Sequence, residues 1–323
     1  MRAFLIRRIL QSLLTLWVIM SIGFVMFRML PGDPSSVIAD PYLGPEEVAH
    51  IKQRYGLDRS VPAQYLIYLQ SLARLDLGNS FFYVRPVTRV MADAVPNTLV
   101  LVFASFLFAY GGAIPAGVLL SWKRGTKLEL AGTFFSLVFR SAPRFWTGLM
   151  AVMIFSYFLD WLPHSGMRTP GYEADNLFEK YVSLDFLQHL ILPTVVSGLY
   201  FLALPLFLIR NTMLEIMGED YIEMARAKGL KEWVVMYRHT LRNALLPVVS
   251  AASVFIGVAL GGQVLIEYIF SWPGLGRELV DSINRHDYPV AQGAFLLIST
   301  TVVAMNFLAD LLYGWLDPRI TYR

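Results

Sequence analysis

The chain contains no cysteine, which excludes disulfide bonds, thiolate metal ligands, haem attachment and a cysteine nucleophile. It is also poor in charge, because Asp, Glu, Lys and Arg make up 16% of its 323 residues, against about 25% in a soluble domain. Hydrophobic residues account for 56%, and the mean hydropathy is +0.52. This composition excludes a disordered chain and a conventional soluble globular protein. The apolar surplus has to face lipid.

Several signatures of enzymes are missing as well. No segment fits the phosphate-binding pattern G-x-x-x-x-G-K-[ST], so the chain lacks a loop with which to hydrolyse ATP itself. No H-E-x-x-H occurs, and the five histidines are dispersed, which leaves no metal site and no catalytic residues to assign. The net charge of +3 comes from bases beside apolar runs and does not indicate nucleic-acid binding. We therefore expect a membrane protein that is not an enzyme and binds no cofactor of its own.

Six charge-poor runs are long enough to cross a bilayer as helices, which takes about 20 apolar residues. They cover 9–27, 94–122, 130–159, 186–209, 243–266 and 288–309. The third run is accepted although it contains Arg140 and Arg144. The first run follows three arginines, as in a signal peptide, but its 19 residues exceed the usual apolar region and no cleavage site is evident before Pro31. We interpret it as a retained helix.

Charged residues between the runs predict the orientation. The segments 1–8, 122–130, 210–246 and 316–323 together carry 14 Lys+Arg and 7 Asp+Glu. The two loops on the other side, 159–187 and 267–287, together carry 4 Lys+Arg and 9 Asp+Glu. The positive-inside rule then puts both termini in the cytoplasm.

The expected organisation is an all-α membrane protein with six transmembrane helices. An N-terminal helix (1–30) leads into a turn-rich segment (31–96), which we expect to form a small extracytoplasmic domain. A five-helix core (97–323) follows, and it includes the cytoplasmic loop 210–246.

That cytoplasmic loop has an ordered charge pattern. Four acids between residues 215 and 223 precede five bases that end at Arg242, which suits the dipole of a helix beginning near Gly218. Gly229 is expected to end this helix. A second, amphipathic helix is indicated by apolar residues at helical spacing, namely Trp233, Met236, Tyr237, Leu241 and Ala244. Such a hairpin is either a solvated surface feature or a docking element for a cytoplasmic partner.

Residues 219–230, EDYIEMARAKGL, resemble the EAA loop of permease subunits of binding-protein-dependent ABC importers, in their dipeptide, oligopeptide and nickel branch. Met224 replaces the middle Ala of the EAA letters, whereas Glu223 and Ala225 match. The proline after the loop comes late, at Pro247, as is usual in the peptide branch. Further matches are MLPGDP at 29–34, DLGNS at 76–80, RHTLRNALLP at 238–247, FSWPGLGR at 270–277, DYP at 287–289 and DPR at 317–319.

The resemblance implies the type I importer permease fold and a location in the inner (cytoplasmic) membrane. Such a subunit pairs with a homologous permease, with two cytoplasmic ATPases that bind ATP and Mg, and with an external solute-binding protein. The residues that it implies for coupling to the ATPases are Glu219, Asp220, Tyr221, Glu223, Ala225, Arg226, Ala227, Lys228 and Gly229. The implied solutes are peptides or peptide-like compounds, with nickel chelates, glutathione and opine-like anionic conjugates as alternatives. A secondary carrier is a more distant alternative, because such carriers usually place ionisable residues at mid-membrane in matched, interrupted halves.

Trp272, Pro273 and Gly274 follow the fifth run and cannot continue a lipid-facing helix. We expect 270–289 to form a re-entrant or interfacial segment at the external mouth, with Ser282 accessible from outside. The alternative is a simple loop in the aromatic belt.

Arg140 and Arg144 lie four residues apart, and so on one face of the expected third helix. Pro143 stands between them in SAPRFW, which resembles a Ser-x-Pro-x-Phe-Trp motif of the branch, where the arginine positions are more often neutral. A cation at mid-membrane has to face the bundle interior or water. Either the two arginines line the translocation path and favour an anionic solute, or they pair with carboxylates or carbonyls across a subunit interface.

Overall fold

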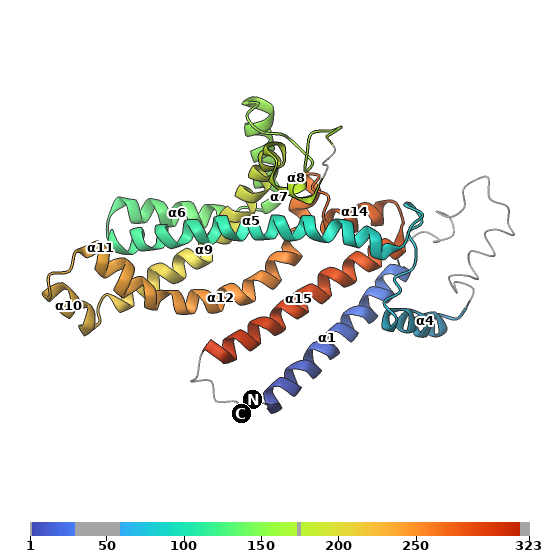
Figure 1. Ribbon diagram of the computed structural model, residues 1–323, viewed down its shortest axis with the longest axis horizontal. Helices are drawn as coiled ribbons and strands as arrows, with labels where there is room; N and C mark the ends of the chain where they lie inside the picture. Colours follow the sequence, from blue (N-terminus) through green and yellow to red (C-terminus); the bar gives the residue numbers. More distant parts are fainter. Residues whose placement is uncertain (1, 30–58, 173–175, 317–323) are drawn as a thin grey trace. The chain divides into compact units, whose positions relative to one another are not determined.

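The structure, a computed structural model, describes residues 2–29, 59–172 and 176–316 (Figure 1). These residues are mostly helical and contain no strand beyond an isolated bridge between Asn79 and Pro86. Much of the expected extracytoplasmic domain, 31–58, lies outside the described residues. The chain divides into two compact units, Met1–Thr98 with Pro273–Ala304, and Leu99–Trp272 with Met305–Arg323.

The first unit contains α1 (Arg2–Met29), α4 (Val61–Ala73), the beginning of α5 (Val87–Trp122), α14 (Leu275–Asn284) and most of α15 (Tyr288–Leu316). Its core joins the start of α5, through Val90 and Met91, to Val290 and Ala294 of α15. The α4 helix meets α1 through Tyr65, whose hydroxyl lies 2.6 Å from Ser21 Oγ.

The second unit is built around α9 (Leu184–Ile216), whose apolar segment is more buried than that of α5. The rest of α5, α6 (Lys127–Ser141) and α7 (Arg144–Ala151) come before it, followed by the π-helical η1 (Val152–Phe158) and α8 (Leu177–Val182). After α9 come α10 (Asp220–Ala227), α11 (Glu232–Val234), the π-helical η2 (Val235–Thr240), α12 (Leu241–Gly262) and α13 (Val264–Ile269). Both α6 and α12 pack against α9.

Four helices among the described residues are long and apolar enough to cross a membrane. Their apolar segments are Leu5–Phe27, Val87–Trp122, Leu184–Ile216 and Tyr288–Leu308. They coincide with the first, second, fourth and sixth expected runs. The fifth run falls on α12 and α13, which are separated at Gln263.

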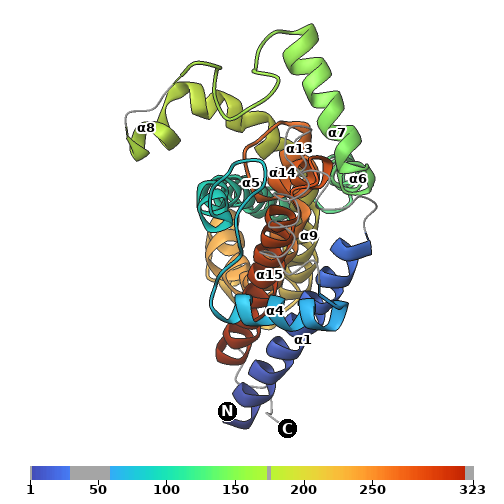
Figure 2. The ribbon, with the colours of Figure 1, turned by 90° about the vertical axis from the view of Figure 1, so that its right-hand side faces the viewer.

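The third run, 130–159, is not one continuous helix, which corrects the sequence-based expectation. The chain changes direction between α6 and α7, as Figures 1 and 2 both show. Ala142 is extended, with ψ 136°, because the ring of a following proline disfavours the helical conformation of the residue before it. Pro143 also has no N–H with which to continue the hydrogen bonds of α6.

Candidate functional site

The expected helix before Gly229 is confirmed. It is α10, which is preceded by Glu219 and has Asp220 and Glu223 in its first turn. Gly229 has φ +76°, a left-handed conformation that only glycine adopts without strain. Among the described residues, no atom beyond Gly229 and its two chain neighbours lies within 4 Å of where a Cβ would be, so conformation rather than space requires the glycine.

Residues 219–235 form a hairpin with an inner and an outer face. Ile222 and Ala225 are buried against Val235 on the inner face. Tyr221 is 42% exposed and Met224 58% exposed on the outer face, where the side chains of Glu219, Asp220, Glu223, Ala227 and Lys228 are exposed as well. Figure 1 shows the hairpin at one end of the second unit, next to the ends of α9 and α12.

Two polar contacts fix the shape of this hairpin. Arg226 Nη2 donates to Glu232 Oε1 at 2.8 Å, and this bond to a carboxylate raises the pKa of the Arg226 guanidinium. Asn243 Nδ2 donates to the Tyr221 hydroxyl at 2.8 Å, which ties the hairpin to the start of α12. Arg226 thus joins α10 to α11 within the hairpin, and Ala225 packs on the buried inner face.

The prediction of a second amphipathic helix after Gly229 is partly wrong. Met236, Leu241 and Ala244 are buried in the core between α9 and α12, as expected. Trp233 and Tyr237 are instead 59% and 45% exposed. The π-helical turn η2 lies in this stretch, and its wider winding shifts the register on which a regular helical spacing depends.

Arg140 and Arg144 do not share one helical face, because the helix breaks between them. Arg140 lies in the last turn of α6, and Arg144 is the first residue of α7. Both nevertheless reach the ring of Tyr200 in α9, with guanidinium carbons 4.3 and 3.9 Å from its centroid. Arg144 also lies 5.0 Å from the ring centroid of Phe201. Tyr200 had no local sequence signal, since it is one aromatic residue in a long apolar run.

Trp272 is fully buried in the second unit, with its ring centroid 5.7 Å from that of Phe186. In the first unit, the Pro273 carbonyl accepts a bond from Asn97 Nδ2 at 2.7 Å, and Gly274 is buried just before α14. The residues that follow thus form a packed helix. Ser282 on this helix is 1% exposed, so the expectation that it is accessible is wrong. Its hydroxyl donates to the Leu279 carbonyl at 3.0 Å, within the same helix.

Asp287 joins two of the motifs quoted above and was missed by sequence reasoning. Its buried carboxylate accepts bonds from Ser80 Oγ at 2.5 Å and from the amides of Phe81 and Phe82 at 3.2 and 3.1 Å. Ser80 Oγ in turn accepts from the Tyr83 amide at 2.8 Å. No sequence spacing links Ser80 to Asp287, which are 207 positions apart.

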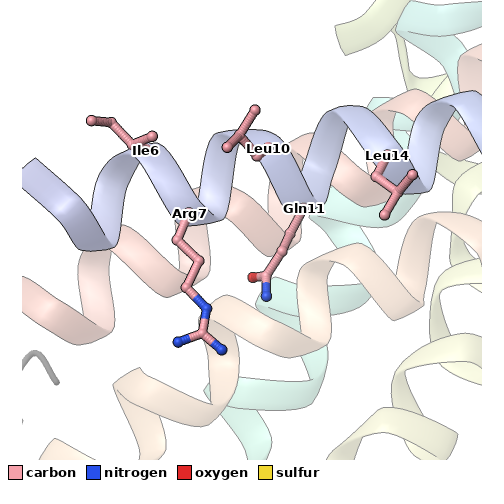
Figure 3. A pocket seen from close by; sticks show the side chains of 5 residues that line it. All are labelled: Ile6, Arg7, Leu10, Gln11 and Leu14. Atoms are coloured by element: carbon pink, nitrogen blue, oxygen red, sulfur yellow. The ribbon is translucent and has the colours of Figure 1, made fainter.

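A groove on α1 is lined by Ile6, Arg7, Leu10, Gln11 and Leu14 (Figure 3). All five residues belong to one helix, and Arg7 and Gln11 point to the same side. A groove of this kind is an open depression in the surface of a helix, and it does not enclose a solute. Among the described residues, no group of three His, Asp or Glu side chains is placed to hold a metal ion.

Residues 113–322 match the family described as binding-protein-dependent transport system inner membrane component, and residues 1–102 match the corresponding N-terminal family. The chain belongs to this family. This permease is therefore a multi-pass inner membrane component of a binding-protein-dependent importer, as the EAA-like loop indicated.

Curated relatives span the whole chain. The permease is 38% identical to the di/tripeptide transport system permease protein DppB of Pseudomonas aeruginosa, with 100% of both chains covered. It is 38% identical to the oligopeptide permease protein AppB of Bacillus subtilis and 37% identical to the dipeptide permease protein DppB of Escherichia coli, again over 100% of each.

A solved structure supports the fold. The MetNI methionine ABC transporter, in an inward-facing conformation, aligns with a TM-score of 0.54 at 20% identity. The alignment covers 71% of this permease and 97% of the MetNI chain. The permease thus has the type I ABC importer fold.

Proposed function

We propose that this permease carries di- and oligopeptides into the cell. The observation that carries the proposal is its end-to-end similarity to three permeases named for peptide transport, at 37 to 38% identity. Nickel chelates, glutathione and opine-like anionic conjugates are the alternative solutes for the same machinery.

The proposed assembly has four kinds of component. This permease pairs with a homologous one, two cytoplasmic ATPases bind ATP and Mg below them, and a solute-binding protein docks outside. The outer face of hairpin 219–235 is the proposed contact with an ATPase. Its exposed Tyr221 and Met224 provide apolar area, and its acids and Lys228 provide polar contacts. Gly229 sets the turn that aims this face.

The proposed topology has six membrane crossings with both termini in the cytoplasm. The α6, α7 and η1 segments together make the third crossing, and α12 with α13 makes the fifth. Residues 31–96 form the extracytoplasmic domain, and 97–323 form the permease core. Trp272, Pro273 and Gly274 lie at the external mouth, and Arg140 and Arg144 line the translocation path.

The solute is tested by reconstituting the complete complex in proteoliposomes. ATP is supplied on the side of the membrane that holds the ATPases, and the binding protein on the opposite side. Labelled dialanine should then accumulate on the ATPase side. The solute that the cognate binding protein retains on purification should be a peptide. Retention of a nickel chelate, with no uptake of any peptide, would refute the peptide proposal.

The coupling role of the hairpin is tested in the same complex. Met224→Glu puts a charge on the exposed outer face and should abolish solute-stimulated ATP hydrolysis while the permease still inserts. Leu128→Glu is the matched control, because Leu128 is 47% exposed and lies in the first turn of α6, on the same side of the proposed topology. Equal solute-stimulated ATP hydrolysis in the Met224→Glu and wild-type complexes would refute the proposed contact between the hairpin and an ATPase.

A further inference from the structure

We infer that the groove on α1 binds an anionic phospholipid, whose phosphate contacts Arg7 and Gln11 and whose acyl chain lies along Ile6, Leu10 and Leu14. The ligand is a membrane lipid and not the solute, so the inference goes beyond the proposed function. It requires only that α1 crosses the bilayer, and it holds whichever way the chain is oriented.

The groove has one apolar and one polar wall. Ile6, Leu10 and Leu14 follow one another at intervals of four residues, and Arg7 and Gln11 have the same spacing. Side chains four residues apart form a ridge along a helix, and two neighbouring ridges border a groove. In Figure 3, Arg7 and Gln11 point to one side of α1, and Ile6 and Leu10 point to the other. Such a groove suits a ligand with an apolar chain and a polar end.

The groove is open to the surroundings of the helix. All five of its side chains are exposed, and the three apolar ones are 58 to 61% exposed. Among the four candidate membrane spans of the described residues, α1 is the least buried, with 11% of its apolar stretch buried against 50% for α9. In a helix that crosses a bilayer, apolar side chains exposed to this degree face lipid acyl chains.

Depth in the membrane brings the polar wall level with the lipid headgroups. The charge-free run of α1 begins at Ile9. With a rise of about 1.5 Å per residue, Arg7 lies about 3 Å outside this run and Gln11 about 3 Å inside it. The headgroup layer on each side of the hydrocarbon core is roughly 5–8 Å thick. A lipid phosphate therefore lies level with Arg7, and the glycerol esters, which border the hydrocarbon, lie level with Gln11.

Charge favours an anionic headgroup. The α1 helix contains four arginines and no Asp or Glu, so no acid on this helix neutralises Arg7. The guanidinium of Arg7 matches two phosphate oxygens with paired N–H donors, and the amide of Gln11 donates to an ester carbonyl. Phosphatidylcholine offers the same phosphate and esters, but its choline group cancels the negative charge. Phosphatidylglycerol keeps that charge and should bind more tightly.

The test uses two photoreactive lipids that differ only in their headgroup. The complete complex is placed in phosphatidylcholine nanodiscs with a small fraction of phosphatidylglycerol or phosphatidylcholine that carries a diazirine on its acyl chain. After illumination, mass spectrometry measures the labelling of residues 6–14. In the wild type, the phosphatidylglycerol probe should label this segment about fivefold more than the phosphatidylcholine probe.

Variants of Arg7 separate charge from shape. Arg7→Gln should bring the labelling by the two probes to the same level, whereas Arg7→Lys keeps the charge and should keep the preference for phosphatidylglycerol. Arg124→Gln is the matched control, because Arg124 is an exposed arginine two residues beyond the end of α5 and outside the groove. It should leave the labelling of residues 6–14 unchanged.

Three results would overturn the inference. The first is a preference for phosphatidylglycerol that persists in Arg7→Gln, and the second is a preference that Arg124→Gln removes equally, since the effect would then be one of general surface charge. The third is a wild type in which neither probe labels residues 6–14 while both label the exposed side of α6, because protein would then cover the groove.

Two measurements on the wild type keep the inference testable should Arg7→Gln fail to insert. Raising the salt concentration should reduce the preference for phosphatidylglycerol, and a preference independent of salt would overturn the inference. Soluble glycerol phosphate should not displace the phosphatidylglycerol probe, because it has no acyl chain for the apolar wall. Displacement would indicate a site for a free phosphate and would also overturn the inference. Peptide uptake enters none of these readouts, so a failure of the proposed function would leave them unchanged.

Discussion

Replacing Asp287 by Asn should loosen the segment 78–86 without unfolding the rest of the first unit. The Asp287 carboxylate is 1% exposed and accepts three hydrogen bonds, from the Ser80 hydroxyl and from the amides of Phe81 and Phe82. Those three donors have a shared acceptor that is both buried and charged. It joins the segment before α5 to the start of α15.

The magnitude follows from the kind of bond that is lost. A hydrogen bond to a charged group contributes about 1.5–3 kcal/mol, and a buried donor left without an acceptor costs about 1–3 kcal/mol. Asn keeps one carbonyl oxygen but turns an NH₂ group toward the donors, so we expect a loss of about 2 kcal/mol in the local opening free energy. Asp287→Ala, which leaves all three donors without this acceptor, should cost about 3–5 kcal/mol.

Hydrogen exchange on the purified complex measures this quantity. A loss of 2 kcal/mol should speed exchange of the Phe81, Phe82 and Tyr83 amides about 30-fold, with little change in the middle of α9. Asp93→Asn is the control, because Asp93 pairs with Arg85 of the same segment at 2.8 Å but is 67% exposed. Exposed pairs contribute about 0–1 kcal/mol, so exchange should rise no more than about fivefold. Equal protection in Asp287→Asn and wild type would refute the reasoning, as would a larger effect of Asp93→Asn.

Three further predictions concern other parts of the chain. Gly229→Val should cost about 1–2 kcal/mol locally because of φ alone, and it should lower solute-stimulated ATP hydrolysis where Gly218→Ala does not; equal stimulation would refute the role of the turn. Because the chain has no cysteine, Asn284→Cys, at an exposed position, should react with an impermeant maleimide from outside and Ser282→Cys should not; reaction only from the cytoplasm would overturn the topology. Burial raises the pKa of the Glu278 carboxyl above its ordinary 4.5, so the folded state binds this proton more tightly than the unfolded state does. Stability should therefore fall as pH rises through that raised pKa, and thermal unfolding of Glu278→Gln should lose this dependence; an unchanged pH profile would contradict it.

Local patterns predicted the long helices and the hairpin. A run of about 20 apolar residues without charge has few stable alternatives to a membrane-spanning helix, and four such runs are helices long and apolar enough to span. The order of acids and bases around Glu223 and Arg226, followed by Gly229, likewise encodes a helix and its end within a dozen residues. These features depend on neighbours in the sequence.

Contacts between distant segments could not be predicted in this way. The bond between Ser80 and Asp287 and the position of Tyr200 beneath two arginines depend on how helices pack, which no periodicity encodes. The break at Pro143 is different, because the proline was visible in the sequence and its effect on Ala142 is local. The apolar length of the run outweighed it in the prediction, and the shared face of Arg140 and Arg144 was inferred wrongly as a result.

The two interrupted apolar runs, 130–159 and 243–266, meet the same part of α9. Tyr200 contacts the arginines beside the first break, and Ser197, one turn earlier in α9, donates to Gln263 Oε1 at 3.1 Å at the second. Gln263 Nε2 and the hydroxyl of Thr194, one further turn away, are buried and have no hydrogen-bond partner among the described residues. Irregular backbone within a membrane is stable only where protein or water satisfies it. Polar side chains of α9 thus lie opposite each break.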